Sequence, residues 1–142
     1  MSDKTFIDTN ILVYAHDLDN ELKHSVAKKI IIDMWESKTG VLSTQVLQEF
    51  YVMLTRKIPR PIEKTVVRGL IKSYLNLDVV VITGDIILHA SEIEESFKLS
   101  FWDALIVSAA YSRNVTSILT EDLNEGQKIE GILIVNPFSD TL

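Results

Sequence analysis

Short apolar segments rich in β-branched residues alternate along this chain with longer segments that have the periodicity of helices. The strand-like segments are residues 5–7, 41–43, 79–82, 117–119 and 132–135. Helical patterns cover about 22–37, 44–56, 62–76, 85–97 and 101–113, and a further short helix is expected just after Asn10. This alternation predicts an α/β fold whose five strands form a central, mostly parallel sheet.

The sequence predicts one domain over residues 1–142, because single cores commonly hold ~100–200 residues. Hydrophobic residues make up 46% of the chain and charged residues 24%, so it has enough apolar surface to fold alone. The clearest loops are residues 57–61 and 83–85. Pro61 is expected to open the helix that follows the first of these loops.

Several classes of protein are disfavoured by what the sequence lacks. No apolar run approaches the ~20 residues of a membrane span, and the first residues lack the apolar core of a signal peptide, so a cytoplasmic protein without a membrane partner is expected. The absence of cysteine excludes disulfides, thiolate zinc sites and cysteine nucleophiles. The five glycines lack the spacing of a dinucleotide fingerprint or a P-loop.

The net charge of −6 argues against a protein that grips nucleic acid through a broad basic face. An acidic chain can still act on nucleic acid where divalent cations reverse the charge of its site. One locally basic stretch fits a solvated helix face better than an RNA contact. It consists of Arg56, Lys57, Arg60, Arg68 and Lys72.

Four acidic residues occupy places where a parallel sheet gathers ligands, just after a strand or early in the following helix. Asp8 ends the first strand, and Asp122 follows the strand at 117–119. Glu49 lies one turn into the helix that begins near residue 44, on the flank of its apolar stripe, where a half-buried side chain is expected. Asp103 opens the most apolar helix of the chain.

Each of these acids, taken alone, also has a purely structural explanation. Asp8 can cap a helix, and Glu49 can be an ordinary solvated side chain. Ser100 and Asp103 form an S-x-x-D capping pattern, and turn chemistry accounts for Asp122. The functional interpretation therefore depends on the four acids acting together.

Carboxylates gathered within a few ångströms repel one another unless they neutralise a bound cation. Oxygen ligands without cysteine select hard ions, so the expected cofactor is Mg²⁺ or Mn²⁺. Such ions bind phosphate and lower the pKa of a coordinated water, which can attack phosphorus without a side-chain nucleophile. The four acids together indicate a metal-dependent phosphodiesterase.

Four motifs around these acids resemble, in the expected order, those of the PIN-domain family, and the likeness covers essentially the whole chain. The motifs are Phe-Ile-Asp-Thr-Asn-Ile-Leu-Val-Tyr-Ala at 6–15, Ser-Thr-Gln-Val-Leu-Gln-Glu-Phe-Tyr at 43–51, Ser-Phe-Trp-Asp-Ala-Leu-Ile at 100–106 and Leu-Thr-Glu-Asp-Leu at 119–123. Any one of these motifs would be a weak signal, whereas four in order are specific.

The resemblance implies a three-layer α/β/α sandwich and a divalent-metal-dependent endoribonuclease that hydrolyses RNA. Many members of that family are VapC-type toxins inhibited by a cognate antitoxin, and a homodimer is expected. The implied catalytic and metal-binding residues are Asp8, Glu49, Asp103 and Asp122, with hydrogen-bonding support from Asn10 and Thr120.

This chain departs from the family pattern in one loop. Many relatives carry a further aspartate shortly after the fourth acid, where this sequence has Leu123-Asn124-Glu125. A contribution from Glu125, and with it a second metal position, stays open. No role is assigned to His16, His24 or His89, and Trp102 is expected to pack among its core-like neighbours rather than to stack on a base.

Two rival functions follow from the same residues. A phosphoacceptor receiver domain would carry adjacent acids after the first strand and a lysine after the last, but Asp8 stands alone and residues 133–138 contain no lysine. The second rival is a non-catalytic PIN-like module that binds RNA or protein. The sequence does not separate a conditional toxin from a housekeeping RNA-processing nuclease, because substrate choice depends on surface shape.

Overall fold

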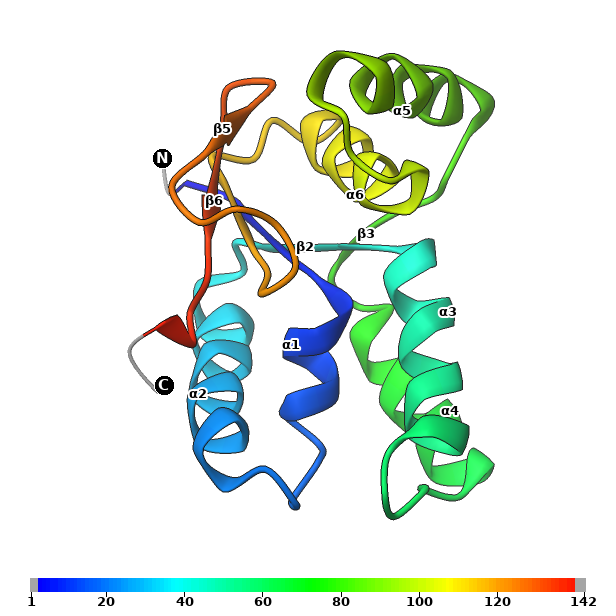
Figure 1. The fold of residues 1–142 in the computed structure, drawn as a ribbon. Coiled ribbons are helices and arrows are strands. Elements are labelled where there is room, and N and C mark those ends of the chain that lie inside the picture. The colour runs from blue at the N-terminus through cyan, green and yellow to red at the C-terminus, as the bar shows by residue number, and fades with distance from the viewer. Residues whose placement is uncertain (1–2, 140–142) are drawn as a thin grey trace.

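The computed structural model describes residues 3–139 and places a six-stranded sheet between two layers of helices (Figure 1). The strands are β1 Thr5–Ile7, β2 Gly40–Ser43, β3 Asp78–Val80, β4 Ser117–Leu119, β5 Lys128–Ile129 and β6 Ile132–Val135. Their order across the sheet is β3-β2-β1-β4-β6-β5, and every neighbouring pair is parallel except β5 and β6. The predicted α/β fold with a mostly parallel sheet is confirmed.

Helices cover both faces of this sheet. They are α1 Thr9–Tyr14, α2 Glu21–Ser37, α3 Thr44–Val52, the π-helical turn η1 Met53–Lys57, α4 Lys64–Tyr74, α5 Gly84–Phe97 and α6 Phe101–Tyr111. Helices α1 to α4 lie on one side of the strands and the α5–α6 pair lies on the other (Figure 1). This arrangement is the expected three-layer sandwich.

The sheet has one strand more than the sequence predicted. The additional strand, β5, forms an antiparallel hairpin with β6 across a two-residue turn of Glu130 and Gly131. Both turn residues have positive φ, 53° and 79°, as the tightest hairpin turns require. A two-residue strand is too short to show a periodic pattern, which explains why the prediction missed it.

Two further predictions about element boundaries were wrong. The helix expected over 44–56 keeps α-helical geometry only to Val52 and continues as η1, in which Ile58 N donates to Met53 O over 3.1 Å. The next helix begins at Lys64, so Pro61 precedes it by three residues instead of opening it. Hydrophobic periodicity alone does not distinguish an α-helical turn from a π-helical one.

At one edge of the sheet the chain turns repeatedly from strand to helix. Side chains at or just after the ends of β1, β2 and β3 cap the helices that begin there: Asp8 accepts from Thr9 N, Ser43 from Val46 N, and Thr83 from Ile86 N. The polar residues required by these caps are therefore concentrated at the carboxyl ends of the strands. Ligand-binding residues of parallel sheets gather at the same edge.

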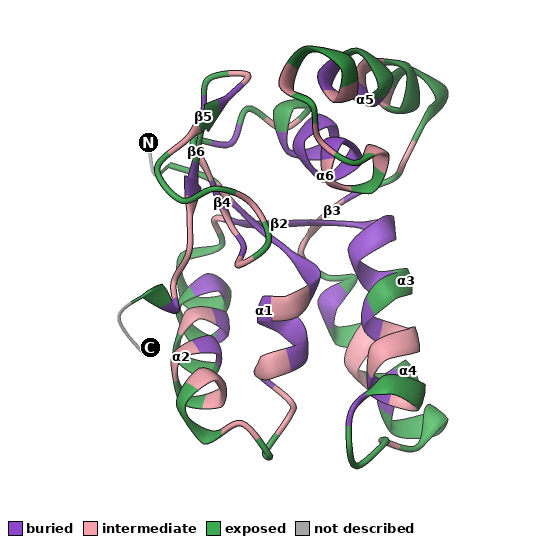
Figure 2. Ribbon diagram, viewed as in Figure 1, coloured by how far each residue is buried: buried purple, intermediate pink, exposed green. Residues whose placement is uncertain are grey.

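Buried hydrophobic side chains from the sheet and both helical layers form one continuous core. Figure 2 shows how buried residues are distributed along these elements. Strand β2 is buried along its whole length, as expected for a strand covered on both faces. Residues 104–110 of α6 are all buried, so this helix packs on several sides. Within residues 3–139, no helix has the length and apolar character needed to cross a membrane.

Candidate active site

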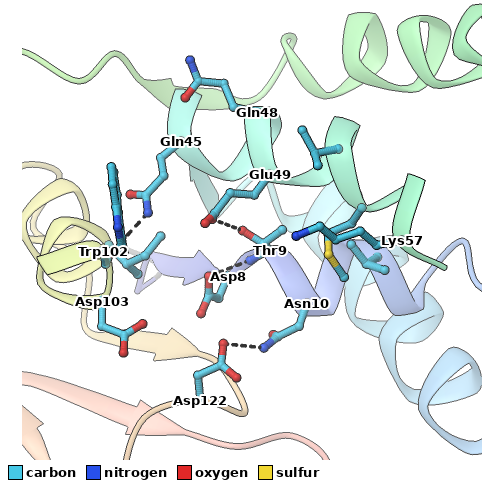
Figure 3. A pocket seen from close by; sticks show the side chains of 14 residues that line it. Asp8, Thr9, Asn10, Gln45, Gln48, Glu49, Lys57, Trp102, Asp103 and Asp122 are labelled. Carbon is cyan, nitrogen blue, oxygen red and sulfur yellow. Dashed lines mark hydrogen bonds between the residues drawn. The ribbon is translucent and has the colours of Figure 1, made fainter. Parts of the chain in front are cut away.

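The four acids predicted from the sequence line one pocket of about 430 Å³ (Figure 3). Asp8 comes from the end of β1, Glu49 from α3, Asp103 from the first turn of α6, and Asp122 from the loop after β4. Asn10 lines the same pocket. The fold therefore brings together carboxylates from four segments that are far apart in the sequence.

Asp8 is the most enclosed acid of the pocket, with only 6% of its surface exposed. One carboxylate oxygen, Oδ1, accepts from Thr9 N over 2.7 Å, and Oδ2 accepts from the Thr120 hydroxyl, also over 2.7 Å. The backbone N–H of Asp8 donates to Leu119 O, which joins the end of β1 to the end of β4. Asp8 is thus both a helix cap and a pocket residue.

Glu49 is exposed instead of half-buried, which corrects the expectation drawn from its place beside the apolar stripe. The stripe itself is buried at Val46 and Phe50, whereas the Glu49 side chain leaves it at the mouth of the pocket. The Thr9 hydroxyl donates to Glu49 Oε1 over 2.8 Å. Because Thr9 N also donates to Asp8, one residue of α1 connects both acids.

Asp122 is oriented by both residues that the sequence assigned to a supporting role. Asn10 Nδ2 donates to Asp122 Oδ2 over 3.0 Å, and Asp122 N donates to the Thr120 hydroxyl oxygen over 3.1 Å. Since the Thr120 hydroxyl itself donates to Asp8, it links the enclosed acid to the loop that carries Asp122. Glu125, in contrast, does not line the pocket and accepts a hydrogen bond from Ser139.

Asp103 has the least constrained carboxylate of the four. Its backbone N–H donates to the Ser100 hydroxyl over 3.1 Å, so the predicted capping pattern is present. Within residues 3–139 its carboxylate accepts no hydrogen bond and makes no ion pair. It faces the pocket and acts electrostatically on Asp122.

Burial and mutual repulsion raise the pKa of two of these acids. The pKa of Asp8 rises from 3.8 to about 6, mainly because the carboxyl is buried, with smaller contributions from the charges of Asp122 and Glu49. Hydrogen bonds from Thr120 and Thr9 N partly oppose this shift. The pKa of Asp122 is also raised, first by burial and then by the neighbouring Asp103 and Glu121 carboxylates. Negative charge is therefore costly in this pocket.

The chemistry of the pocket fits a hard divalent cation. Its possible ligands are carboxylates together with Asn10 Oδ1, a buried oxygen that accepts no hydrogen bond within the described part of the chain. In residues 3–139, no three or more His, Asp or Glu side chains are already grouped closely enough to hold an ion. An open arrangement of this kind agrees with Mg²⁺, which commonly uses one or two carboxylates and completes its shell with water and substrate.

The sequence did not identify three further features of the site. Among residues 3–139, Lys57 is the one basic residue that lines the pocket, although the sequence pattern suggested a solvated helix face there. Trp102 was expected to be packed but is 63% exposed and also lines the pocket. Glu121 anchors the loop of Asp122, because its carboxylate accepts from Tyr14 Oη over 2.6 Å and from Lys23 Nζ over 2.8 Å. These features depend on contacts between distant segments.

Residues 5–127 match the family described as PIN domain. The chain belongs to the PIN-domain family. No curated protein matches the sequence.

Solved structures with this fold cover nearly all of this PIN domain. VapC20 from Mycobacterium tuberculosis, described as a sarcin-ricin loop cleaving toxin, is 21% identical, with a TM-score of 0.66 and coverage of 84% of this chain and 92% of that one. A toxin-antitoxin complex from Klebsiella pneumoniae is 20% identical, with a TM-score of 0.67 and coverage of 94% and 98%. DNA-bound VapBC from Salmonella typhimurium is 18% identical, with a TM-score of 0.66 and coverage of 96% and 99%. At these identities the likeness establishes a shared fold.

Proposed function

We propose that this PIN domain is a divalent-metal-dependent endoribonuclease that hydrolyses phosphodiester bonds of RNA. The observation that carries the proposal is the pocket in which Asp8, Glu49, Asp103 and Asp122 converge from four segments of the chain. Carboxylates of a merely structural kind would be dispersed over the surface or paired with basic side chains. Mg²⁺ or Mn²⁺ is the cofactor that suits these oxygen ligands.

Hydrogen bonds from neighbouring residues hold and orient the acids. Asp8 is fixed through both carboxylate oxygens, Thr9 orients Glu49, and Asn10 orients Asp122. The Thr9 and Thr120 hydroxyls both donate to carboxylates, which assigns them to positioning. A bound divalent ion would supply positive charge that neutralises the phosphate and activates water for hydrolysis.

The proposal includes a role as the toxin of a toxin–antitoxin pair, with a cognate antitoxin protein as partner. Support comes from one structural neighbour that is described as a VapC toxin and another that is described as a toxin–antitoxin complex. The homodimer and the cytoplasmic location stay predictions. Light scattering of the purified chain would measure the first of these directly.

The decisive experiment is cleavage of labelled single-stranded and structured RNA panels in Mg²⁺, in Mn²⁺ and in EDTA. Wild type is compared with Asp8→Asn and Asp103→Asn, and Glu125→Gln serves as the matched control because this acid lies outside the pocket. Metal-dependent cleavage lost in both aspartate variants and kept in the control is the expected result. Failure of the wild type to cut any RNA, or cleavage unaffected by the substitutions, would favour a non-catalytic binding module.

A further inference from the structure

A large aromatic side chain and a basic one lie on opposite sides of the acid pocket. Of the exposed large hydrophobic side chains in residues 3–139, only Trp102 lines this pocket. Lys57 is the only basic residue of the lining, and Figure 3 shows it reaching in from the side opposite Trp102. In this view the side chains of Glu49 and Asp8 lie between them.

Trp102 lies outside the core but contacts two neighbouring residues. Its ring meets that of Phe101 edge-to-face at a centroid distance of 5.4 Å, and its backbone oxygen accepts from Gln45 Nε2 over 3.2 Å. Nevertheless, 63% of the residue stays exposed. An exposed indole that contacts Phe101 and lies next to Asp103 is suited to stack on a planar group that enters the pocket.

The position of Lys57 depends on the π-helical turn η1. This wider turn is confined to the five residues Met53–Lys57, and both its first and last residues line the pocket. Ile58, with extended backbone, ends the helix directly after Lys57, so the cation also lies at the end where the helix dipole favours positive charge. Within residues 3–139 Lys57 makes no ion pair, which leaves its ammonium group available to an anion.

We infer that Trp102 and Lys57 form a nucleotide subsite in which an unpaired RNA base stacks on Trp102 while Lys57 contacts a backbone phosphate. This inference rests on the proposed function, because the phosphate at the acids brings its own base within reach of the pocket wall. Stacking requires a base that is not paired in a duplex. The preferred substrate is therefore a single-stranded or looped segment of RNA.

The base contact is tested by kinetics on one cleaved RNA and on copies with an abasic nucleotide at each position near the cut. At one position, loss of the base should raise KM of the wild type about tenfold or more. Trp102→Ala should raise KM similarly and make the enzyme insensitive to that abasic substitution, whereas Trp102→Phe should retain most of the affinity. Because Trp102 is largely exposed, its substitution leaves the fold intact. Additive effects of Trp102→Ala and the abasic position would overturn the inference.

The phosphate contact has a different signature. Lys57→Gln should raise KM equally for intact and abasic RNAs and should lower the salt dependence of binding by about one ion. Lys72→Gln on α4 is the matched control, because Lys72 is exposed and lies outside the pocket. Equal KM values for these two lysine variants would contradict the assignment of Lys57.

A binding measurement separates failure of the subsite from failure of the proposed nuclease. The chain has two tryptophans, so Trp35→Phe leaves Trp102 as the sole indole reporter. Titration with RNA in Ca²⁺, which takes the same oxygen ligands as Mg²⁺, should quench its fluorescence, and the abasic RNA should not. Quenching without cleavage by the wild type would contradict the nuclease alone. Cleavage without base-dependent quenching would contradict the subsite alone and would leave Trp102 as a surface for a protein partner.

Discussion

The inner and outer parts of the acid pocket hold their carboxylates in different environments. Asp8, at the inner end, is 6% exposed and accepts hydrogen bonds through both oxygens. Glu49 and Asp122, at the outer side, are exposed and each accepts one side-chain hydrogen bond. The inner acid is therefore fixed in position at a cost in stability, whereas the outer acids retain freedom to adjust to a ligand.

The largest difference between the two parts is expected in catalysis. Asp8→Asn should lower the single-turnover cleavage rate by roughly a thousandfold, because preorganised charge acts most strongly away from water. Glu49→Gln should lower this rate by only about ten- to a hundredfold, because solvent screens the charge of Glu49 and water can partly replace its carboxylate. Rates are measured at saturating Mg²⁺, with Glu125→Gln as the unaffected control. Equal losses for the inner and outer variants would remove the distinction.

The same inner carboxylate should destabilise the metal-free protein. The folded-state pKa of Asp8 is raised from 3.8 to about 6, so the stability that the protonated carboxyl contributes is fully present below pH 3.8 and is lost as pH rises through 6. This shift corresponds to about 3 kcal/mol. Asp8→Asn should therefore raise the free energy of unfolding at pH 7.5 by up to about 3 kcal/mol and bring little gain at pH 3.5. Glu49→Gln should change it by less than about 0.5 kcal/mol at either pH.

Urea denaturation of the three proteins in EDTA measures these differences. Comparing each variant with the wild type at the same pH cancels the titration of groups that all three share. A stability gain of Asp8→Asn that is as large at pH 3.5 as at pH 7.5 would show that burial of the charge is not its cause.

A bound divalent ion should offset part of this cost. At an ion concentration tenfold above Kd the wild type should gain about 1.4 kcal/mol at pH 7.5. The gain should shrink at pH 5, where Asp8 is mostly protonated and protons compete with the cation. Thermal melting with Mg²⁺ or Mn²⁺, repeated for Asp8→Asn, measures the effect without reference to activity. Equal gains for both proteins at both values of pH would place the ion elsewhere.

The inner part of the site could be predicted from the sequence because it depends on local order along the chain. Asp8 follows a β-branched strand and precedes a helix, so its place at the sheet edge follows from the alternation of elements. The same reasoning placed Asp103 and Asp122 near the edge. It failed for β5, whose two residues carry no periodic signal, and for η1, whose apolar pattern resembles that of an α-helix.

The exposure and the contacts of residues around the outer acids could not be predicted, because they depend on which distant segments meet. Nothing near Trp102 in the sequence indicates that its ring lies outside the core, since the following residues of α6 are all buried. The exposure of Glu49 likewise depends on where α3 meets the pocket mouth. The contacts of Glu121 with Tyr14 and Lys23 join residues about a hundred positions apart. Single-residue patterns carry no information about such contacts.

The smallest effect is expected at the anchor of the outer loop. Glu121 accepts from Tyr14 and Lys23, and side-chain exposures of 21% for Glu121 and 23% for Lys23 leave their ion pair partly screened by solvent. Glu121→Gln keeps one acceptor but removes the charge. Loss of the ion pair should weaken the anchor by about 0.5–1 kcal/mol, which corresponds to a two- to fivefold lower cleavage rate. Because Glu121 acts through Asp122, the loss should appear as a higher Mg²⁺ requirement with KM for RNA unchanged. An increase in KM alone would instead indicate that Glu121 contacts RNA. The outer acids would then bind Mg²⁺ without help from the contacts of Glu121 with Tyr14 and Lys23.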